Sequence, residues 1–314
     1  MDIQKVRQMA FQLLQNPRYF GPGVNGSLNN FIHTRGGSRE FNPAGVNVFE
    51  EDWDNLIILD ACRYDEFADH THLLPDGDLQ KRMSRGSHSR EWVKGNFGQR
   101  LHDVAYLSTN LFYSRLKENG HLEEGEVHEF LAVQEEEGWE NHGKYGPTPE
   151  KTTRQAKRLA DEYQDKRFVV HYMQPHCPYL GKVGRKRFNP DDTPRVVCRS
   201  DRPEATPEVL RTAYQENLQL VLELVMELLP ELNGKTVISA DHGELLGDRS
   251  APIPVKDWGH PEGVYVPELT EVPWYVIESE DRKRIVSEPP DGSDGADELK
   301  PDYVKDQLEQ LGYV

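Results

Sequence analysis

Cysteine is scarce in this 314-residue sequence. The three cysteines, Cys62, Cys177 and Cys198, cannot all pair within one chain, and their spacing does not match a metal finger. A disulfide framework and a finger-type zinc site are therefore excluded. This cysteine usage favours a reducing compartment.

Long apolar runs are missing as well, and no segment approaches the roughly 20 apolar residues of a membrane-spanning helix. The first 20 residues, MDIQKVRQMAFQLLQNPRYF, place apolar side chains at helical spacing but contain no continuous apolar core and no small-residue cleavage site. We expect an amphipathic helix here rather than a signal peptide. No transmembrane segment is expected, and the protein is predicted to be cytoplasmic.

Positive charge is the third shortage, with 37 Lys and Arg residues against 54 Asp and Glu residues and a formal net charge of -17. An acidic surface repels the phosphates of nucleic acids, so we expect no nucleic-acid partner. Counterions screen the self-repulsion of such a surface. The composition therefore indicates a high-salt cytoplasm and a halophilic archaeal source.

This acidic composition predicts a fold that depends on salt. As potassium chloride rises from low to molar concentration, we expect Tm to rise by about 5 °C or more, because counterions screen the repulsion between carboxylates. Thermal melting followed by circular dichroism measures the shift. A Tm that stays constant over this range would contradict the high-salt interpretation.

Strand and helix patterns alternate along the chain. Short continuous apolar runs typical of buried strands occur in NLIILD, DVAYLS, RFVVHYM, KTVISA and EVPWYVIES, and helices are expected over 149–164 and 207–229. Continuous apolar strands separated by helices are typical of α/β proteins. We therefore predict a mostly parallel central sheet with helices on both faces.

The sequence divides into three parts. Residues 1–48 are predicted to form an N-terminal helix and an irregular, glycine-rich arm. Residues 49–280 carry the strand and helix patterns and form the predicted catalytic domain, in which the acidic stretch 118–150 is interpreted as a solvated insertion. Residues 281–314 are expected to be a hydrophilic linker and a short C-terminal helix.

Ionisable side chains stand where three of the expected strands end. Asp60 ends the first, His171 and His176 lie at or just past another, and Asp241 and His242 end a third. Sites of open α/β sheets lie beyond the carboxyl ends of the strands, so we expect these side chains to converge. Carboxylates with imidazoles favour zinc or manganese over calcium or magnesium.

The third strand end reads VISADHGELLGD. A sharp turn through Gly243 would let Asp241 and His242 point into one site. We expect Glu244 to support these ligands from outside the metal's own ligand set.

These motifs resemble the alkaline phosphatase superfamily, especially its sulfatase-like branch. SADHGELLGD is similar to the DHGE segment of that branch, and HYMQPHCPY is similar to its H…PH.PY segment. YQENLQLVLELV and WGHPEGVYVPELTEVPW are similar in order and spacing, so the resemblance runs from about Asp54 to Ile277. It implies an alkaline-phosphatase-like fold and attack on a phosphoryl or sulfuryl centre by a nucleophile bound to a metal.

The nucleophile of true sulfatases is a formylglycine made from Cys or Ser in the pattern C/S-x-P-x-R, which does not occur between Asp60 and the second expected strand. SRGSHSREW instead resembles the nucleophile segment of lipoteichoic acid synthases and phosphoethanolamine transferases. Aligning Glu91 and Trp92 with the acid-aromatic pair of that segment places Ser87 at the nucleophile position, where the family has threonine. Ser89 is then expected to cap a helix, although either hydroxyl remains a candidate.

The strand-end positions, the resemblance and the nearby cations together predict the site residues. The metal ligands are Asp60, Ser87, Asp241 and His242. The catalytic groups are Ser87, His176 and His260, and the two histidines bind the substrate anion, protonate a leaving group or complete a second metal site. The substrate-binding groups are Arg63, Arg90 and His171.

These observations predict a metal-dependent hydrolase or transferase that acts on small-molecule or glycan-linked phosphate esters. One alternative is a sulfate-ester hydrolase with the same ligands. Another is a noncatalytic binding protein that the metal stabilises. Activity on aryl phosphates, phosphodiesters and sulfates separates the first two, and full metal occupancy without turnover would favour the third.

Overall fold

The computed structural model describes residues 28, 31–32, 34, 39–122, 126–133, 148–190, 192–194, 206–250 and 255–290. Within these ranges a seven-stranded sheet has the order β2-β9-β6-β1-β5-β3-β4. Its strands are β1 (Asn55–Leu59), β2 (Asp78–Met83), β3 (Leu101–Ser108), β4 (Val127–Ala132), β5 (Arg167–Tyr172), β6 (Thr236–Ser239) and β9 (Glu271–Ile277). The helices expected at the two ends of the chain lie outside the described residues.

The sheet is mostly parallel. β1 pairs in parallel with β5 on one side and β6 on the other, and β3 pairs in parallel with β5 and β4. β9 is antiparallel to both β6 and β2. The carboxyl ends of β6, β1, β5 and β3 therefore meet at one edge of the sheet.

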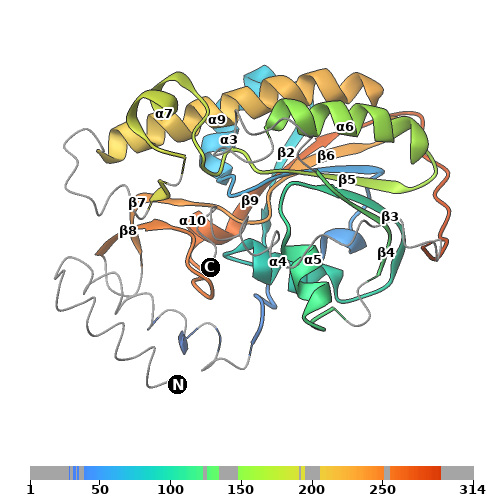
Figure 1. Cartoon of the computed structure of the whole chain (residues 1–314), viewed down its shortest axis with the longest axis horizontal. Helices are drawn as coiled ribbons and strands as arrows, with labels where there is room; N and C mark the ends of the chain where they lie inside the picture. The colour runs from blue at the N-terminus through green and yellow to red at the C-terminus, as the bar shows by residue number, and fades with distance from the viewer. Residues whose placement is uncertain are drawn as a thin grey trace.

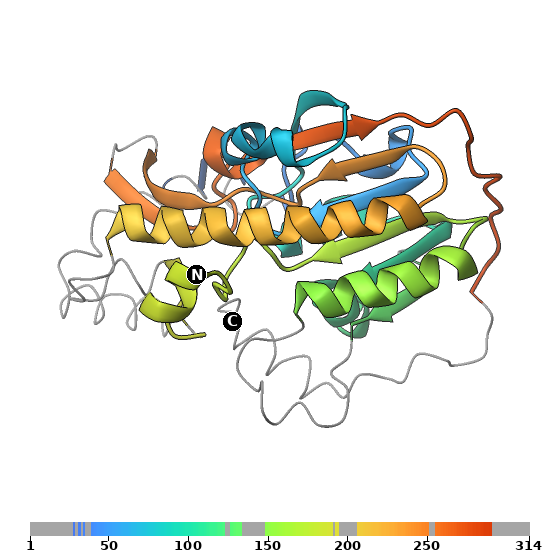
Figure 2. The ribbon, with the colours of Figure 1, turned by 90° about the horizontal axis from the view of Figure 1, so that it is seen from above.

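Helices cover both faces of this sheet, as the sequence predicted (Figure 1). α3 (Tyr64–His70), α6 (Pro149–Glu162) and α9 (Pro207–Leu228) pack on one face, and α6 and α9 lie side by side there (Figure 2). α4 (Ser89–Phe97) and α5 (Phe112–Glu118) pack on the other. Side chains of β1 alternate between the faces, so Leu56 and Ile58 join one core and Ile57 and Leu59 the other.

The long helix α9 follows from its capping and its apolar stripe. Thr206 accepts a hydrogen bond from the backbone N–H of Val209, and Pro207 occupies the first turn, where its missing N–H costs nothing. The buried residues of α9 recur at helical spacing, and they include Leu210, Tyr214, Leu218, Val221, Leu222 and Val225. Burial of these side chains against the sheet fixes the position of α9, and with it that of Tyr214.

The acidic stretch 118–150, which we expected to be a solvated insertion, contributes β4 to the edge of the sheet. Only Val127 of this strand is fully buried. An edge strand tolerates charged side chains because one of its sides faces solvent, and the charges concealed its strand pattern. The strand at the other edge, β2, consists mostly of polar residues and escaped prediction for a similar reason.

The remaining elements are short. A separate two-stranded sheet pairs β7 (Leu245–Ser250) with β8 (Val255–Gly259), and helices α7 (Lys182–Arg187) and α10 (Pro267–Thr270) lie nearby. The 3-10 helices are η2 (Val48–Glu50), η3 (Thr71–Leu73) and η5 (Leu229–Glu231). The helices of the described ranges include none with the length and apolar character to cross a membrane.

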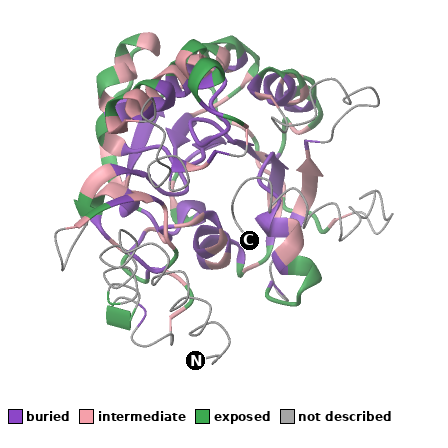
Figure 3. Ribbon diagram, turned by 60° about the vertical axis from the view of Figure 1, so that its left-hand side comes forward, coloured by how far each residue is buried: buried purple, intermediate pink, exposed green. Residues whose placement is uncertain are grey.

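Burial is concentrated in the central sheet and in the inward sides of its helices (Figure 3). Several ionisable side chains nevertheless have exposures of 1% or less, and most of them follow the carboxyl ends of the parallel strands: Asp60, His171, His176, Asp241, His242 and Glu244. Burying charge is costly unless it is compensated. This cluster therefore needs a physical explanation.

Candidate metal centre

Asp60, Asp241 and His242 come together because the strands that precede them, β1 and β6, are parallel neighbours. His242 Nε2 lies 3.7 Å from Asp60 Oδ1 and 3.4 Å from Asp241 Oδ2. One ligand atom from each of the three residues lies within 4.8 Å of the others. The structure thus brings together the three strand-end ligands expected from the sequence, and we call them the first group.

Backbone contacts orient these ligands. Asp241 Oδ1 accepts hydrogen bonds from the N–H groups of Ala61, at 3.1 Å, and His242, at 2.8 Å. The Nδ1 of His242 lies 2.8 Å from the carbonyl oxygen of Gly243. Because a carbonyl only accepts, this contact places the ring proton on Nδ1 and leaves the Nε2 lone pair facing the carboxylates.

Gly243 is required by close packing. Its N–H donates to Leu269 O at 2.8 Å, and a Cβ at this position would lie 2.1 Å from the carbonyl oxygen of Glu268. Any larger residue would push the DHG segment away from α10. We expected Gly243 to provide a sharp turn. The structure shows that glycine is needed because the backbone of α10 lies against it.

Ala61 adopts the left-handed conformation, with φ of 60°, at the turn that follows Asp60. The Tyr214 hydroxyl of α9 donates to Ala61 O at 2.7 Å and accepts from Arg63 N at 3.0 Å, so it spans the turn. The same turn directs the Ala61 N–H at Asp241. An unfavourable backbone conformation is therefore held where it orients a ligand.

Replacing Tyr214 with phenylalanine is expected to lower the free energy of unfolding by about 1–3 kcal/mol, because two buried backbone groups lose their partner. Adding Ala61→Gly should recover part of this loss, since a left-handed alanine costs about 1–2 kcal/mol. Urea unfolding of the two variants and the wild type measures both effects. Equal stability of Tyr214→Phe and wild type would show that the hydroxyl does not hold the turn.

The serine at the first group is Ser89. Its Oγ lies 3.3 Å from Asp60 Oδ2 and 3.2 Å from His242 Nε2, and the side chain is fully buried. Ser89 is the first residue of α4. The residue we expected to cap this helix thus contacts the metal ligands instead.

Ser87, expected from the family alignment to bind the metal, points elsewhere. Its Oγ lies 2.8 Å from Glu91 Oε2 and 2.9 Å from Pro261 O, and it accepts from Val264 N at 3.2 Å. The reason is the start of α4, where the N-cap is His88, whose Nδ1 accepts from the backbone N–H of Arg90. Because α4 begins at Ser89, the Ser89 hydroxyl faces the ligands. The Ser87 hydroxyl instead bonds the distant loop at Pro261 and Val264.

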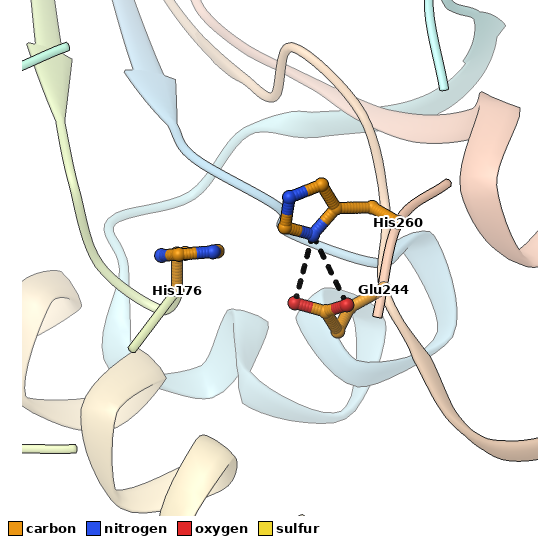
Figure 4. A group of neighbouring side chains, drawn as sticks. All are labelled: His176, Glu244 and His260. Carbon is orange, nitrogen blue, oxygen red and sulfur yellow. Dashed lines mark hydrogen bonds and ion pairs between the residues drawn. The ribbon is translucent and has the colours of Figure 1, made fainter. Parts of the chain in front are cut away.

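A second group consists of His176, Glu244 and His260 (Figure 4). His260 Nδ1 lies 3.2 and 3.3 Å from the two carboxylate oxygens of Glu244, and the rings of His176 and His260 are 5.0 Å apart. The His260 ring lies 4.6 Å from that of His242, so the groups adjoin. Glu244, expected only to support other ligands, is itself a candidate ligand.

The charges of the two groups suit a cation. Burial lowers the pKa of His176 to about 3, so its imidazole is neutral and can bind a metal. Burial opposes ionisation of Asp241, but His242 and His171 together bring its pKa below the ordinary value. The carboxylate is therefore ionised in a fully buried position, where a metal ion would compensate its charge.

Partly exposed residues mark the open side of the centre. His88 is half-buried, and its ring lies 5.4 Å from that of His260, whose side chain is 11% exposed. Asp60, Ser89 and His242 lie deeper, without exposure. A ligand would therefore reach the serine past His88 and His260.

Arg63, expected to bind substrate, has its guanidinium occupied. It bonds both carboxylate oxygens of Asp65, at 2.8 and 2.6 Å, Asp248 Oδ2 at 2.6 Å and the carbonyl oxygen of Glu244 at 3.0 Å. Its side chain is 5% exposed. Arg63 therefore supports the backbone of Glu244, and its guanidinium N–H groups are already used in these bonds.

The other predicted substrate-binding residues lie on different sides of α4. Arg90 is half-exposed, 3.5 Å from Glu262, and lines a polar cavity of about 320 Å³ with Lys94 and Arg39. His171 is instead fully buried behind the first group. A substrate cannot touch His171 without displacing the ligands of the first group, and the cavity beside Arg90 is lined by none of those ligands.

The sequence interpretation missed Asn110 and His88. The side-chain amide of Asn110 donates to Asp60 Oδ2 at 2.8 Å. Asn110 follows β3, so the rule that sites lie beyond strand ends would have identified it. His88 is identifiable only once the start of α4 is known.

Comparison with known proteins gives a likeness of fold. No family model and no curated protein matches this chain. Among solved structures, it is similar to the C-terminal periplasmic domain of EcEptC from Escherichia coli in complex with Zn, with 13% identity over 82% of this chain and 81% of that one and a TM-score of 0.48. The phosphonate monoester hydrolase SpPMH from Silicibacter pomeroyi gives 15% identity, 82% and 72% coverage and a TM-score of 0.44.

A third similar structure is described as a protein in the alkaline phosphatase superfamily from Vibrio parahaemolyticus, with 12% identity, 77% and 64% coverage and a TM-score of 0.43. The superfamily named in this description is the one that the motifs resemble.

Proposed function

We propose that this chain is a metal-dependent hydrolase or transferase of phosphate esters in which Ser89 is the nucleophile. The placement of the Ser89 hydroxyl carries the proposal. It lies within 3.3 Å of both Asp60 and His242, at the start of a nine-residue helix and inside a buried group of carboxylates and imidazoles. A serine in such surroundings is suited to attack an electrophile at neutral pH.

The donor atoms of both groups fit divalent metal ions. Asp241 Oδ2 and His171 Nε2 are buried and have no hydrogen-bond partner within the described ranges, which is expected of atoms that face a cation. Mixed oxygen and imidazole donors favour zinc or manganese. When bound, a metal at the first group would lower the pKa of the Ser89 hydroxyl and balance the charge of the carboxylates.

The residues of the chain then place the phosphoryl group. Ser89 Oγ forms a bond to phosphorus while the bond from phosphorus to the leaving oxygen breaks, and the alcohol takes its proton from solvent. In the first turn of α4 the N–H groups of Arg90, Glu91 and Trp92 are bonded to His88, so the N–H of Ser89 is the backbone group proposed to donate to a nonreacting phosphoryl oxygen. Transfer to water or to an acceptor alcohol then frees the serine.

Phosphate is favoured over sulfate by the sequence around the reactive position. Residues 89–93 read SREWV, which has neither the proline nor the arginine of the C/S-x-P-x-R formylglycine pattern. The unmodified hydroxyl is thus the available nucleophile. The noncatalytic alternative retains the same ligands, and only turnover separates it.

The test is to incubate the protein with zinc or manganese in molar potassium chloride and supply p-nitrophenyl phosphate, its bis-ester and p-nitrophenyl sulfate. We expect hydrolysis of at least one phosphate ester and, after rapid acid quenching, a phosphoryl group on Ser89 in the tryptic digest. Faster hydrolysis of the sulfate would support the sulfatase alternative. Full metal occupancy without turnover of any ester would refute the proposed catalysis.

A further inference from the structure

His171 occupies an unusual position behind the first group. It is the penultimate residue of β5, an inner strand of the sheet, and its ring is fully buried. The ring Nδ1 lies 2.8 Å from the Tyr106 hydroxyl, and Nε2 lies 3.8 Å from both Asp60 Oδ2 and Asp241 Oδ2. These distances exceed a hydrogen bond, and Nε2 has no hydrogen-bond partner in the part of the chain that the structure describes.

The contact between His171 Nδ1 and the Tyr106 hydroxyl bears on which ring nitrogen carries the proton. A phenol hydroxyl can donate to this nitrogen or accept from it. When the Tyr106 oxygen accepts, the proton of a neutral His171 ring is on Nδ1 and Nε2 presents a lone pair. This is the tautomer that binding of a metal through Nε2 selects.

In that tautomer a lone pair is directed at two carboxylate oxygens, which is unfavourable unless a cation lies between them. Asp241 Oδ2 faces the same space and also has no hydrogen-bond partner among the described residues. The spacing suits one ion, because ligand atoms that are each about 2.0–2.2 Å from a zinc ion lie at most about 4.4 Å apart. The distances from Nε2 to both oxygens satisfy this limit.

We propose that His171 is a ligand of the metal bound by Asp60, Asp241 and His242, and not a group that binds the substrate. The proposal rests on the metal of the proposed function but not on the reaction. Tyr106 then accepts from Nδ1 and holds the imidazole in the tautomer and orientation that metal binding needs. An ion with affinity for imidazole, zinc above all, is the expected occupant.

The test is a zinc titration of the full-length protein against a chromophoric chelator. To observe the first group alone, every protein carries Glu244→Gln, which removes the carboxylate of the second group. Adding His171→Ala should raise the Kd for zinc more than about a hundredfold, and Tyr106→Phe, which affects only the support of the ring, should raise it about 10- to 100-fold. His102→Ala, on β3 and outside both groups, is the matched control and should leave Kd unchanged.

Cobalt provides a second readout that a loss of packing would not produce. The ligand-field spectrum of the Co(II) protein should change in His171→Ala because a nitrogen ligand is lost, whereas His102→Ala should retain the parent spectrum. His171→Gln preserves much of the side-chain volume and should also bind zinc weakly while keeping the near-UV circular dichroism of the parent.

Three outcomes are informative. If His171→Gln binds zinc and cobalt as the parent does but raises KM in a background that retains Glu244, His171 binds substrate and the inference is overturned. If zinc binding depends on His171 but no ester is turned over, the inference stands and the proposed function fails. If the protein binds no zinc or manganese at all, both fail.

Discussion

Ser89→Ala is expected to lower kcat on p-nitrophenyl phosphate at least about a thousandfold, because covalent catalysis is lost. The buried hydroxyl is the only serine oxygen in contact with both Asp60 and His242 among the described residues. Alanine removes it without introducing bulk. KM should change little, since alanine leaves the backbone at the start of α4 and the ligands Asp60, Asp241 and His242 in place.

Ser87→Ala is the matched control, two residues away on the same segment. Its hydroxyl contacts Glu91, Pro261 and Val264, so its loss should loosen the loop that follows His260. We expect a stability loss of about 1 kcal/mol and a fall in kcat of less than about tenfold. Steady-state kinetics and urea unfolding of both variants measure the difference.

The opposite pattern would return the nucleophile to the position predicted from sequence. Loss of turnover in Ser87→Ala with activity retained in Ser89→Ala would require the SRGSH segment to move until Ser87 meets the ligands. If both variants keep wild-type kcat, neither serine is the nucleophile, and water attacks directly. Mass spectrometry of the acid-quenched peptide that contains GSHSREW identifies the phosphorylated residue in the first case.

The fold and the first group were predictable because they depend on local patterns and one topological rule. Apolar runs of strand length that alternate with helical stripes predict a parallel sheet. The carboxyl ends of parallel strands share one edge, so Asp60, Asp241 and His242 had to lie close together. Neither step needs knowledge of how distant loops pack.

The choice between Ser87 and Ser89 depends on such packing. Alignment of a short motif fixes a position only if no residue is added or lost between its landmarks. The direction of each hydroxyl is set by where α4 begins and by the loop at Pro261, which lies 174 residues further along the chain. The sequence around the two serines contains no information about that contact.

Arg63 illustrates a related limit. A cation beside an expected phosphate site is a reasonable anion clamp, but its partners are determined by the tertiary structure. Asp65 is nearby in sequence, whereas Asp248 reaches Arg63 from the strand that follows Glu244. With these partners Arg63 supports the second group, a role that appears only when β1 and β7 are placed together.

Loss of metal is the second large effect that we expect. The wild-type protein should bind two zinc or manganese ions per chain, one in each group of ligands. Asp241→Asn should lose the ion of the first group and nearly all turnover, and Glu244→Gln should lose the ion of the second. Elemental analysis after dialysis against a metal-buffered solution gives the stoichiometry. One ion in the wild type, retained in Glu244→Gln, would restrict the centre to the first group.

Asp241→Asn also separates the effect of charge from that of shape. Its amide oxygen can still accept from the N–H groups of Ala61 and His242, while its uncharged NH₂ replaces the unpartnered Oδ2. Without metal the variant should therefore unfold at higher urea concentration than the wild type, because an uncompensated buried charge is gone. With zinc at 100 times its Kd the order should reverse, since binding then stabilises the wild type by about 2.7 kcal/mol per site. If Asp241→Asn were less stable than the wild type in both conditions, the carboxylate would serve the fold itself, and the first group would not be a metal site.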